Sequence, residues 1–542
     1  MGITFSLFEA FMVGLFYYLA YAEICMPFVG QGLQDPATIG LLIGLVYGDP
    51  KTGLIVGASI GMLYISNMTV GGNLPSDAIL AACISVPIAI KSGIPTETAV
   101  AFAIPFSVLG TFVDNARRLI NGHWNRKANQ HVENGQYDKI FFDAVIGPSL
   151  VSAAIRIIPL TALLYLFGGT AGELVSQMPA WLNNAFMVIG GMLPGLGLAL
   201  CVNFMGKKEL LPYFLVGFYA VYLGKFNVVF VALIGIAIAF VHLNLTASQY
   251  EDDEDEEDEA MEVEKNAVWT PEGAFSKPSE CDRWSFKYFF FFRISQCLEY
   301  FYGTGIGYVM LKPLKKIYKG NEDGLKAAMK RHLQPFITNP VWGFPLISGS
   351  LAMEEDIAKN GDPDGTKADA IVAMKTGLMG PLAGLGDGLQ GSIVMPLFKS
   401  FCYPLALSGN YIGAFPFAYW FAEMLVAAII AGRIGYTYGR HGILRIINSP
   451  ILKKMLVGAG ILGIIMMGAL SAGYVSLNLG IQWTTNMGVT NINDILNGLI
   501  PGCLVLAYMG ISYTLLSKGT SFIKLVLGVC VFGIVGSLIG IV

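Results

Sequence analysis

Charged residues are scarce in this sequence. Asp, Glu, Lys and Arg together make up 13% of its 542 residues, whereas soluble globular chains contain about 25%. Hydrophobic residues reach 54%, and the mean hydropathy is +0.60. The shortage of charge excludes nucleic-acid binding and a soluble catalytic core as leading interpretations, and it predicts an integral membrane protein.

Patterns for metal binding and phosphoryl transfer are also missing from the sequence. The five histidines include no pair with metal-ligand spacing, and none lies in a recognisable phosphoryl-acceptor context. The eight cysteines form no Cys-x-x-Cys pair and lie mostly in apolar segments, as small core residues do. We therefore expect no metal, no cofactor and no phosphoryl-carrying histidine, so that any phosphorylation needs an external donor.

The net charge of −4 combines an acidic run with a basic remainder. Residues 251–264 (EDDEDEEDEAMEVE) hold eleven of the 38 acidic residues, so the rest of the chain carries +7. Basic residues mark the cytoplasmic loops of membrane proteins. We expect such loops, and the acidic run with them, at three clusters: Arg117, Arg118, Arg126 and Lys127; Lys312, Lys315, Lys316, Lys319, Lys330 and Arg331; Arg433, Arg440, Arg445, Lys453 and Lys454.

Apolar segments compatible with membrane helices, which need about 20 residues, occur on both sides of the acidic run. They lie near 5–28, 37–66, 78–113, 143–169, 186–206 and 211–243, and then near 341–353, 371–398, 401–432, 454–477, 495–516 and 520–542. The first is expected to be a retained span rather than a cleaved signal peptide, because it has no basic start and contains Glu9 and Glu23. A charged stretch at 311–336 is typical of an amphipathic helix pair at the membrane interface.

Several apolar segments are interrupted by turn-forming residues. GDPKTG (48–53) divides 37–66, while Gly93, Pro95 and Pro105 divide 78–113. Such interruptions predict half-helices or re-entrant loops, which membranes tolerate where backbone faces protein or a water-filled cavity. The sequence thus predicts an all-α polytopic membrane protein with two membrane halves, 1–245 and 284–542, joined by an acidic disordered linker at 246–283.

A Gly-Asp-x-x-x-Gly pattern follows a glycine-rich apolar run in each half. The two runs are GLLIGLVYGDPKTG (40–53) and GLMGPLAGLGDGLQG (377–391). Two short similar motifs do not establish a repeat, but such motifs are expected in two halves that are related by inverted pseudo-symmetry.

Longer motifs in both halves resemble one transporter family. The first half contains LLIGLVYGDPKTGLIVGASIGM (41–62), VGGNLPSDAILAACIS (70–85) and LLPYFLVGF (210–218). The second contains KRHLQPFITNP (330–340), LAMEE (351–355) and KTGLMGPLAGLGDGL (375–389). Residues 1–245 resemble the IIC membrane subunit of the mannose-type phosphoenolpyruvate:sugar phosphotransferase system, and 284–542 resemble its IID subunit, which is normally a separate chain.

The resemblance implies a sugar permease in the bacterial cytoplasmic (inner) membrane. In the family, IIC and IID together conduct the sugar, usually as a trimer of heterodimers, and an elevator-type motion carries it inward. Cytoplasmic IIA and IIB proteins carry the phosphoryl group on histidines and deliver it to the incoming sugar. Fusion through the linker would enforce one-to-one stoichiometry and raise the effective concentration of the halves. The expected partners are therefore a sugar-like substrate, IIA/IIB proteins, further copies in a homotrimer and the lipid bilayer, and no nucleic acid.

Carboxylates within apolar sequence are the candidate site residues. An intramembrane charge costs about 2.5–3.5 kcal/mol on insertion scales, so a functional role is the default there. Carboxylates and amides also suit a sugar, because they meet several hydroxyls at once. In the first half the substrate-binding candidates are Asp49, Thr52, Asn67, Thr69, Asn73 and Asp77; helix capping is an equal alternative for Asp49 and a weaker one for Asp77.

In the second half the substrate-binding candidates are Glu299, Glu354, Asp387 and Gln390. Glu354 has the alternative of facing cytoplasmic water, and Glu423 is interpreted as a polar contact between helices. Asp387 is the strongest candidate, since it lies in an uncharged stretch between Gly386 and Gly388. Asp387 or Asp77 is the catalytic candidate that takes the proton from a sugar hydroxyl during phosphoryl transfer.

Some polar positions depart from the family pattern. Gly61 stands where a glutamate is expected in IIC, and Cys297, Tyr300 and Tyr302 stand where IID members have Asn, Arg and Gln. Gly388 and Met395 replace an expected proline and arginine. The fold assignment is little affected, but two alternatives to a coupled permease stay open: an uncoupled carrier or channel, and a non-transporting sensor on the same scaffold.

Overall fold

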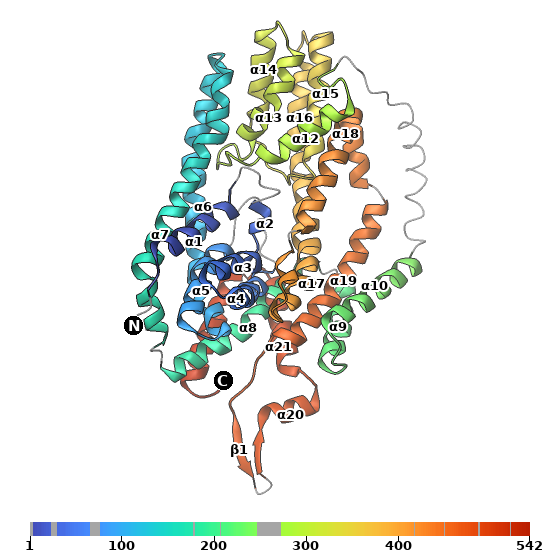
Figure 1. Cartoon of the computed structure of the whole chain (residues 1–542). Helices are drawn as coiled ribbons and strands as arrows, with labels where there is room; N and C mark the ends of the chain where they lie inside the picture. Colours follow the sequence, from blue (N-terminus) through green and yellow to red (C-terminus); the bar gives the residue numbers. More distant parts are fainter. Residues whose placement is uncertain are drawn as a thin grey trace.

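The protein is almost entirely helical, with one short hairpin (Figure 1). The structure, a computed structural model, describes residues 4–22, 30–65, 76–176, 179–205, 208–246, 273–416, 418–448, 450–485, 488–520 and 522–542. Most of the predicted linker lies outside these ranges. The fold class predicted from composition, an all-α polytopic membrane protein, is confirmed.

The described part of the first half consists of short helices followed by longer ones. Its α-helices are α1 (Leu7–Ala20), α2 (Gln31–Leu33), α3 (Pro36–Tyr47), α4 (Pro50–Leu63), α5 (Ala78–Ser92), α6 (Thr96–Glu133), α7 (Gly147–Ser176), α8 (Ala180–Met205), α9 (Pro212–Tyr222) and α10 (Val228–Leu245). Short 3₁₀ or π turns are η2 (Tyr137–Lys139), η3 (Phe142–Ile146) and η4 (Lys208–Leu210).

The second half contains the hairpin near its end. Its helices are α12 (Pro278–Phe291), α13 (Gly303–Ile317), α14 (Glu322–His332), α15 (Phe344–Asn360), α16 (Thr366–Gly386), α17 (Met395–Leu407), α18 (Ala418–Asn448), α19 (Pro450–Tyr474), α20 (Ile492–Leu499), α21 (Cys503–Ser517) and α22 (Phe522–Leu538). The π-helix η6 (Asp387–Val394) and the 3₁₀ turn η7 (Tyr411–Ala414) flank α17. Strands β1 (Gln482–Thr485) and β2 (Gly488–Asn491) pair antiparallel, Gln482 opposite Asn491.

The segment 37–66 is broken as the sequence predicts. Helix α3 ends at Gly48, whose φ of 81° is the left-handed conformation that glycine adopts easily, and Asp49 caps α4. The two helices lie against each other so closely that a Cβ at Gly53 would be 2.3 Å from the Gly40 carbonyl oxygen. The paired glycines therefore make this antiparallel helical hairpin possible.

The segment 78–113 is broken at one of its two expected sites. Helix α5 ends at Gly93, which has a φ of 64°, and α6 then begins at Thr96. The expected break at Pro105 is wrong, because α6 continues through it to Glu133. A proline at this position removes one backbone hydrogen bond, the one to the carbonyl of residue 101, and membrane helices tolerate such a proline.

The charged stretch at 311–336 forms a helix pair, as predicted. Helix α13 ends in the basic residues Lys315 and Lys316, and α14 begins with Glu322 and Asp323 after the cap Asn321. Figure 1 shows both helices together with α12 and α15 at one end of the molecule. This group of helices, α12 to α15, is called the upper lobe below.

Two hydrophobic cores hold the molecule together, and they do not follow the two sequence halves. The first core unites α3, α4, α5 and α8 with α17, α19, α21 and α22 from the second half. The second core joins the upper lobe to α16 and α18 and to the end of α6, where Val132 is buried. Each sequence half therefore contributes to both cores.

Within the described ranges, four helical segments are long and apolar enough to cross a membrane: Thr96–Glu133, Tyr137–Gly169, Ala180–Asn203 and Val457–Tyr474. A fifth candidate is the bent pair α20 and α21, which meet at 77°. Six further apolar helices are only 10–17 residues long, and α1, α3, α5 and α9 are among them. Interrupted membrane segments are thus a main feature of this fold.

The two Gly-Asp motifs adopt different backbones. GDPKTG forms the turn between α3 and α4, whereas Asp387 starts the π-helix η6, which continues α16 into α17. The motifs are therefore not equivalent local structures, and inverted pseudo-symmetry stays a prediction.

Candidate functional site

Asp387 lies in a cluster of amides and carboxylates contributed by separate elements. The Asn339 amide donates to Asp387 Oδ1 at 3.1 Å and to Gln390 Oε1 at 2.7 Å. The Gln390 amide in turn donates to Glu423 on α18. Asp387 and Gln390 stand three residues apart on the π-helix η6, and both contact Asn339, which precedes α15. The sequence-based interpretation of Glu423 as a contact between helices is confirmed.

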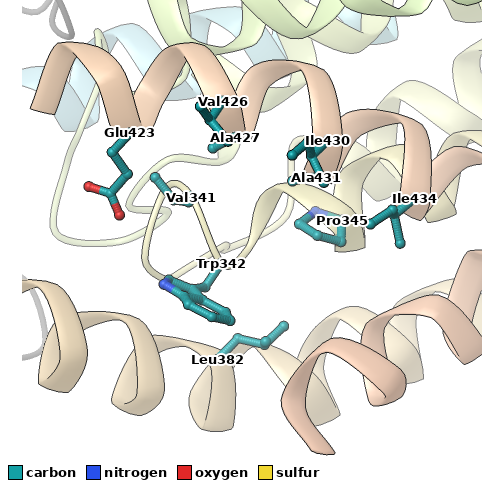
Figure 2. A pocket seen from close by; sticks show the side chains of 10 residues that line it. All are labelled: Val341, Trp342, Pro345, Leu382, Glu423, Val426, Ala427, Ile430, Ala431 and Ile434. Carbon is teal, nitrogen blue, oxygen red and sulfur yellow. The ribbon is translucent and has the colours of Figure 1, made fainter. Parts of the chain in front are cut away.

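A cavity of about 270 Å³ adjoins this cluster (Figure 2). Glu423 and Trp342 line it together with apolar side chains: Val341, Pro345, Leu382, Val426, Ala427, Ile430, Ala431 and Ile434. Figure 2 shows the residues of α18 along one side and Leu382 of α16 opposite. Because nearly all of this lining is apolar, the cavity does not suit a polyhydroxylated solute, and the polar cluster beside it does.

Four buried charged residues of the first half form a second cluster. Asp114 accepts from Arg117 at 2.9 Å, from Arg118 at 2.7 Å and from Arg156 at 3.4 Å. Each arginine is at most 2% exposed. The expectation that Arg117 and Arg118 belong to a basic cytoplasmic loop is therefore wrong: α6 continues through both, and Asp114, one turn earlier, pairs with them inside the protein.

The arginine cluster reaches the second half of the chain. Arg117 Nη2 donates to Gln296 Oε1 at 3.2 Å, and Arg293 Nε lies 3.5 Å from the same oxygen. Arg293 also interacts electrostatically with Asp387. The Tyr302 hydroxyl lies within electrostatic reach of Arg117, Arg118, Arg293 and Asp387. The two clusters are thus parts of one polar network where the two sequence halves contact each other. This contact region is called the seam below.

Asp77 joins this network through two tyrosines. Its carboxylate accepts from Tyr17 at 2.7 Å and Tyr21 at 2.8 Å, and the Arg156 guanidinium lies over both rings. The same carboxylate caps α5 by accepting from the backbone N–H groups of Ile79 and Leu80. Asp77 is 1% exposed, and its carboxylate accepts hydrogen bonds from four donors. The capping alternative is observed, and the two tyrosines and Arg156 connect Asp77 to Asp114.

Glu354 is buried in the upper lobe rather than facing water. It accepts from Tyr318 at 2.6 Å, from Arg331 at 3.0 and 2.8 Å, and from His332 at 3.1 Å. Although burial alone would raise it, these donors lower the pKa of Glu354 to about 2. Burial lowers the pKa of His332 to about 4, so its imidazole is neutral at pH 7. The motifs KRHLQPF and LAMEE therefore meet in one structural contact.

The remaining candidates have other contacts or lie outside the described residues. Asp49 accepts from the Thr52 N–H at 3.0 Å as the cap of α4, and Lys51 of the same turn lies beside Gly409. Helix α17, about 20 Å long, separates that end from η6. Glu299 forms a half-exposed ion pair with Arg126 at 3.1 Å. Asn67, Thr69 and Asn73 lie outside the described residues.

A further polar contact across the seam was not expected from the sequence. Asp35 caps α3 and accepts from the Tyr403 hydroxyl at 2.7 Å, with Lys399 Nζ 3.7 Å away. The Tyr403 hydroxyl lies 2.5 Å from where a Cβ at Gly61 would be, so its ring fills the space that a side chain there would need. The sequence offered one sign that Asp35 matters: it stands directly before a proline in an apolar segment.

The histidines with described side-chain contacts have structural neighbours. His131 contacts Asp143 at 2.5 Å, His242 contacts Tyr213 at 2.9 Å and His332 contacts Glu354. His123 packs edge-on against Trp124.

The apolar helices, the glycine-packed hairpin and the polar network buried between the halves define a polytopic membrane transporter. The family model for the PTS system sorbose-specific IIC component matches residues 7–241, and the model for the PTS system mannose/fructose/sorbose family IID component matches 278–542. The chain therefore belongs to the mannose-type family of phosphotransferase-system permeases, with its IIC and IID components in one polypeptide.

Individual relatives cover the two halves separately. The fructose permease IID component of Bacillus subtilis is 32% identical over 43% of this chain and 85% of its own length. The mannose-specific EIIC component of Escherichia coli K12 is 28% identical over 42% of this chain and 88% of its own. A cryo-EM structure of the mannose transporter ManYZ with microcin E492 matches 48% of this chain and 97% of that chain, at 30% identity and a TM-score of 0.28.

Proposed function

We propose that this protein carries a sugar or sugar derivative across the bacterial cytoplasmic membrane and couples its entry to phosphorylation by a partner IIB protein. Residues 1–245 would act as the IIC component and 284–542 as the IID component, with 246–283 as the tether. A IIA protein would supply the phosphoryl group to IIB. A homotrimer would be the assembled form, as the family resemblance implies.

The observation that carries this proposal is the hydrogen bonding of Asp387. Among the described residues, Asn339 is the one hydrogen-bond donor to this carboxylate, so Oδ2 is available to accept from a substrate hydroxyl. Asp77 and Glu354 each accept four hydrogen bonds. Unlike Asp77 and Glu354, Asp387 therefore has capacity for a ligand, and Gln390 and Asn339 supply amides beside it.

Asp387 would also assist the chemical step. The sugar hydroxyl oxygen attacks the phosphorus of the phosphohistidine on IIB; the new O–P bond forms as the P–N bond breaks, and the hydroxyl proton passes to Asp387. The histidine of IIB keeps the electron pair of the broken bond. Asp77 would hold Tyr17 and Tyr21 against Arg156 rather than contact the sugar.

Uptake into vesicles tests the proposal. Vesicles containing the full chain are supplied with labelled sugar, with and without phosphoenolpyruvate and the soluble phosphotransferase proteins. We expect phosphorylated product only with the donor system, and about a hundredfold or greater loss of it in Asp387→Asn, because general-base contributions are about 10²–10⁴-fold. Asp356→Asn, which changes an exposed carboxylate paired with Lys367, should keep full activity.

An uncoupled carrier is the alternative, and the Gly61–Tyr403 contact favours it specifically, since Tyr403 fills the space for the acidic side chain expected at position 61. Unmodified sugar that accumulates equally with and without phosphoenolpyruvate would establish the uncoupled carrier and contradict the coupled permease.

A further inference from the structure

Glu423 is the one ionisable residue in the described lining of the apolar cavity that adjoins the Asp387 cluster (Figure 2). A carboxylate at an apolar surface is costly unless it is hydrogen-bonded, and here the Gln390 amide nitrogen donates to Glu423 Oε1. A hydrogen bond to a charged group is stronger than one between neutral groups, and surroundings of low polarity strengthen it further. Glu423 therefore holds the Gln390 amide more firmly than a neutral acceptor would.

The contact with Glu423 fixes which way the Gln390 amide faces. An ionised carboxylate only accepts, so Gln390 Nε2 faces Glu423, and Gln390 Oε1 accepts from Asn339 Nδ2 at 2.7 Å. In the opposite orientation the two amide nitrogens of Gln390 and Asn339 would face each other, and no hydrogen bond could form between them. The charge on Glu423 thus selects one of two amide orientations that have the same shape.

Asn339 is oriented by its other end as well. Its Oδ1 atom accepts from the backbone N–H groups of Val341 at 3.0 Å and Trp342 at 3.3 Å. Its Nδ2 group has two hydrogens, and these are donated to Gln390 Oε1 and, at 3.1 Å, to Asp387 Oδ1. Asn339 is thus the donor to both side chains of η6, and it holds Asp387 by one of its two oxygens.

We propose that Glu423 is a positioning residue for Asp387 and acts through Gln390 and Asn339. Glu423 holds the Gln390 oxygen against Asn339, and Asn339 in turn holds Asp387 Oδ1 so that Oδ2 meets the substrate hydroxyl. This series of contacts, which is called the amide chain below, joins α18, η6 and the segment before α15. The role rests on the proposed function of Asp387, and it assigns Glu423 no contact with the sugar.

Removing the acceptor at position 423 tests the amide chain. Vesicles with the full chain receive phosphoenolpyruvate, the soluble phosphotransferase proteins and labelled glucose, mannose or fructose. Glu423→Leu suits the apolar lining, and we expect kcat for phosphorylated product to fall about tenfold or more with a smaller change in KM, because misplacing a catalytic group by about 1 Å can cost about a hundredfold. Ile430→Leu, which alters the same cavity wall outside the amide chain, should keep the wild-type kcat.

The double variant Gln390→Leu/Glu423→Leu shows whether Glu423 acts through Gln390. Once Gln390→Leu has interrupted the amide chain, the further change Glu423→Leu should alter kcat by less than about twofold, because residues that act through one another are not additive. Unfolding temperatures of all variants are recorded beside the rates. A structural role alone would lower the unfolding temperature of Glu423→Leu and leave its kcat per folded protein unchanged.

Three results would overturn the proposal: wild-type kcat in Glu423→Leu, a loss confined to the unfolding temperature, and an undiminished further loss of kcat in the Gln390→Leu background. If Glu423→Leu does not fold, Glu423→Gln decides, since its neutral amide no longer selects one orientation of Gln390; we expect a several-fold lower kcat, and wild-type kcat would contradict the role.

Failure of the proposed function gives a different result. A wild type that accumulates only unmodified hexose would contradict coupling to phosphorylation and leave the amide chain to be judged by the KM of that uptake. We then expect a higher KM in Glu423→Leu, and a KM equal to that of the wild type would overturn the positioning role.

Discussion

At the scale of single residues, buried carboxylates in this protein differ in how many donors surround them. Asp77 and Glu354 accept four hydrogen bonds each, and their donors are fixed parts of the fold. Asp387 accepts from Asn339. A saturated carboxylate stabilises its surroundings, whereas one with a free oxygen can exchange water for a ligand. We propose that this difference separates structural acids from a functional acid that looks like them in sequence.

Removing the charge of Glu354 should destabilise the upper lobe strongly. Glu354→Gln leaves the partly buried Arg331 without its carboxylate, and breaking a buried ion pair costs up to about 3–5 kcal/mol of unfolding free energy. The matched control is Glu299→Gln, which breaks an exposed pair with Arg126 worth about 0–1 kcal/mol. Thermal unfolding in detergent measures both, and equal effects of the two variants would contradict the structural role of Glu354.

The buried His332 should make stability depend on pH. Its pKa falls from 6.5 in the unfolded chain to about 4 in the folded protein, so the unfolded state binds more protons between these values. Unfolding free energy should therefore decline as the pH is lowered from about 6.5 to about 4. Glu354, with a pKa of about 2, adds a loss below about 4.5.

His332→Gln should flatten the decline between pH 6.5 and 4, and His123→Gln, which changes an exposed histidine, should not. Unfolding temperatures recorded across this range for the two variants provide the comparison. A slope that survives in His332→Gln would assign the acid sensitivity to another group.

At the scale of elements, glycine contacts allow the interrupted helices to pack. A Cβ at Gly53 would lie 2.3 Å from the Gly40 carbonyl oxygen, which is backbone and cannot rotate away. The helix α16 passes into η6 without a break, and Asp387 and Gln390 of η6 both contact Asn339. The candidate site therefore combines η6 with the segment before α15.

Gly53→Ala should separate α3 from α4. Overpacking of a tight contact costs about 1–3 kcal/mol, so we expect a lower unfolding temperature and weaker transport. Gly377→Ala is the control, because its Cβ would meet nothing within 4 Å, and alanine in a helix is more stable than glycine by about 0.5–1 kcal/mol. The same change in both variants would mean that close approach of the hairpin is not required.

At the scale of the whole molecule, the two sequence halves are interleaved rather than adjacent. Helices α19, α21 and α22 share a core with the first half, and α6 reaches into the core of the upper lobe. Polar contacts cross the same seam, including Tyr403 to Asp35 and Arg117 to Gln296. Association of the halves therefore has its own stabilising contacts.

Deleting residues 251–262 should leave membrane insertion intact. The deleted run is mostly acidic and buries no apolar surface in our interpretation of the sequence, while both cores are formed elsewhere. Membrane fractionation and detergent extraction measure the inserted protein. A protease site placed in the same run offers a second check, since the cleaved halves should copurify. Loss of all inserted protein on deletion would show that the linker is structural.

Composition and turn residues determined the membrane class of this protein and the break points of its helices, because hydrophobicity, glycine and proline act locally and can be read along the chain. Its two components came from the resemblance of its motifs to a known family. They also predicted the break at GDPKTG and the helix pair at 311–336. The tertiary structure decided which side chains contact one another. Arg117 and Arg118 look like loop cations in sequence, and only folding shows that Asp114, Arg156 and Gln296 surround them. Hydrogen bonds between residues far apart in the chain depend on packing, and packing decided that Asp77 and Glu354 are saturated whereas Asp387 is not.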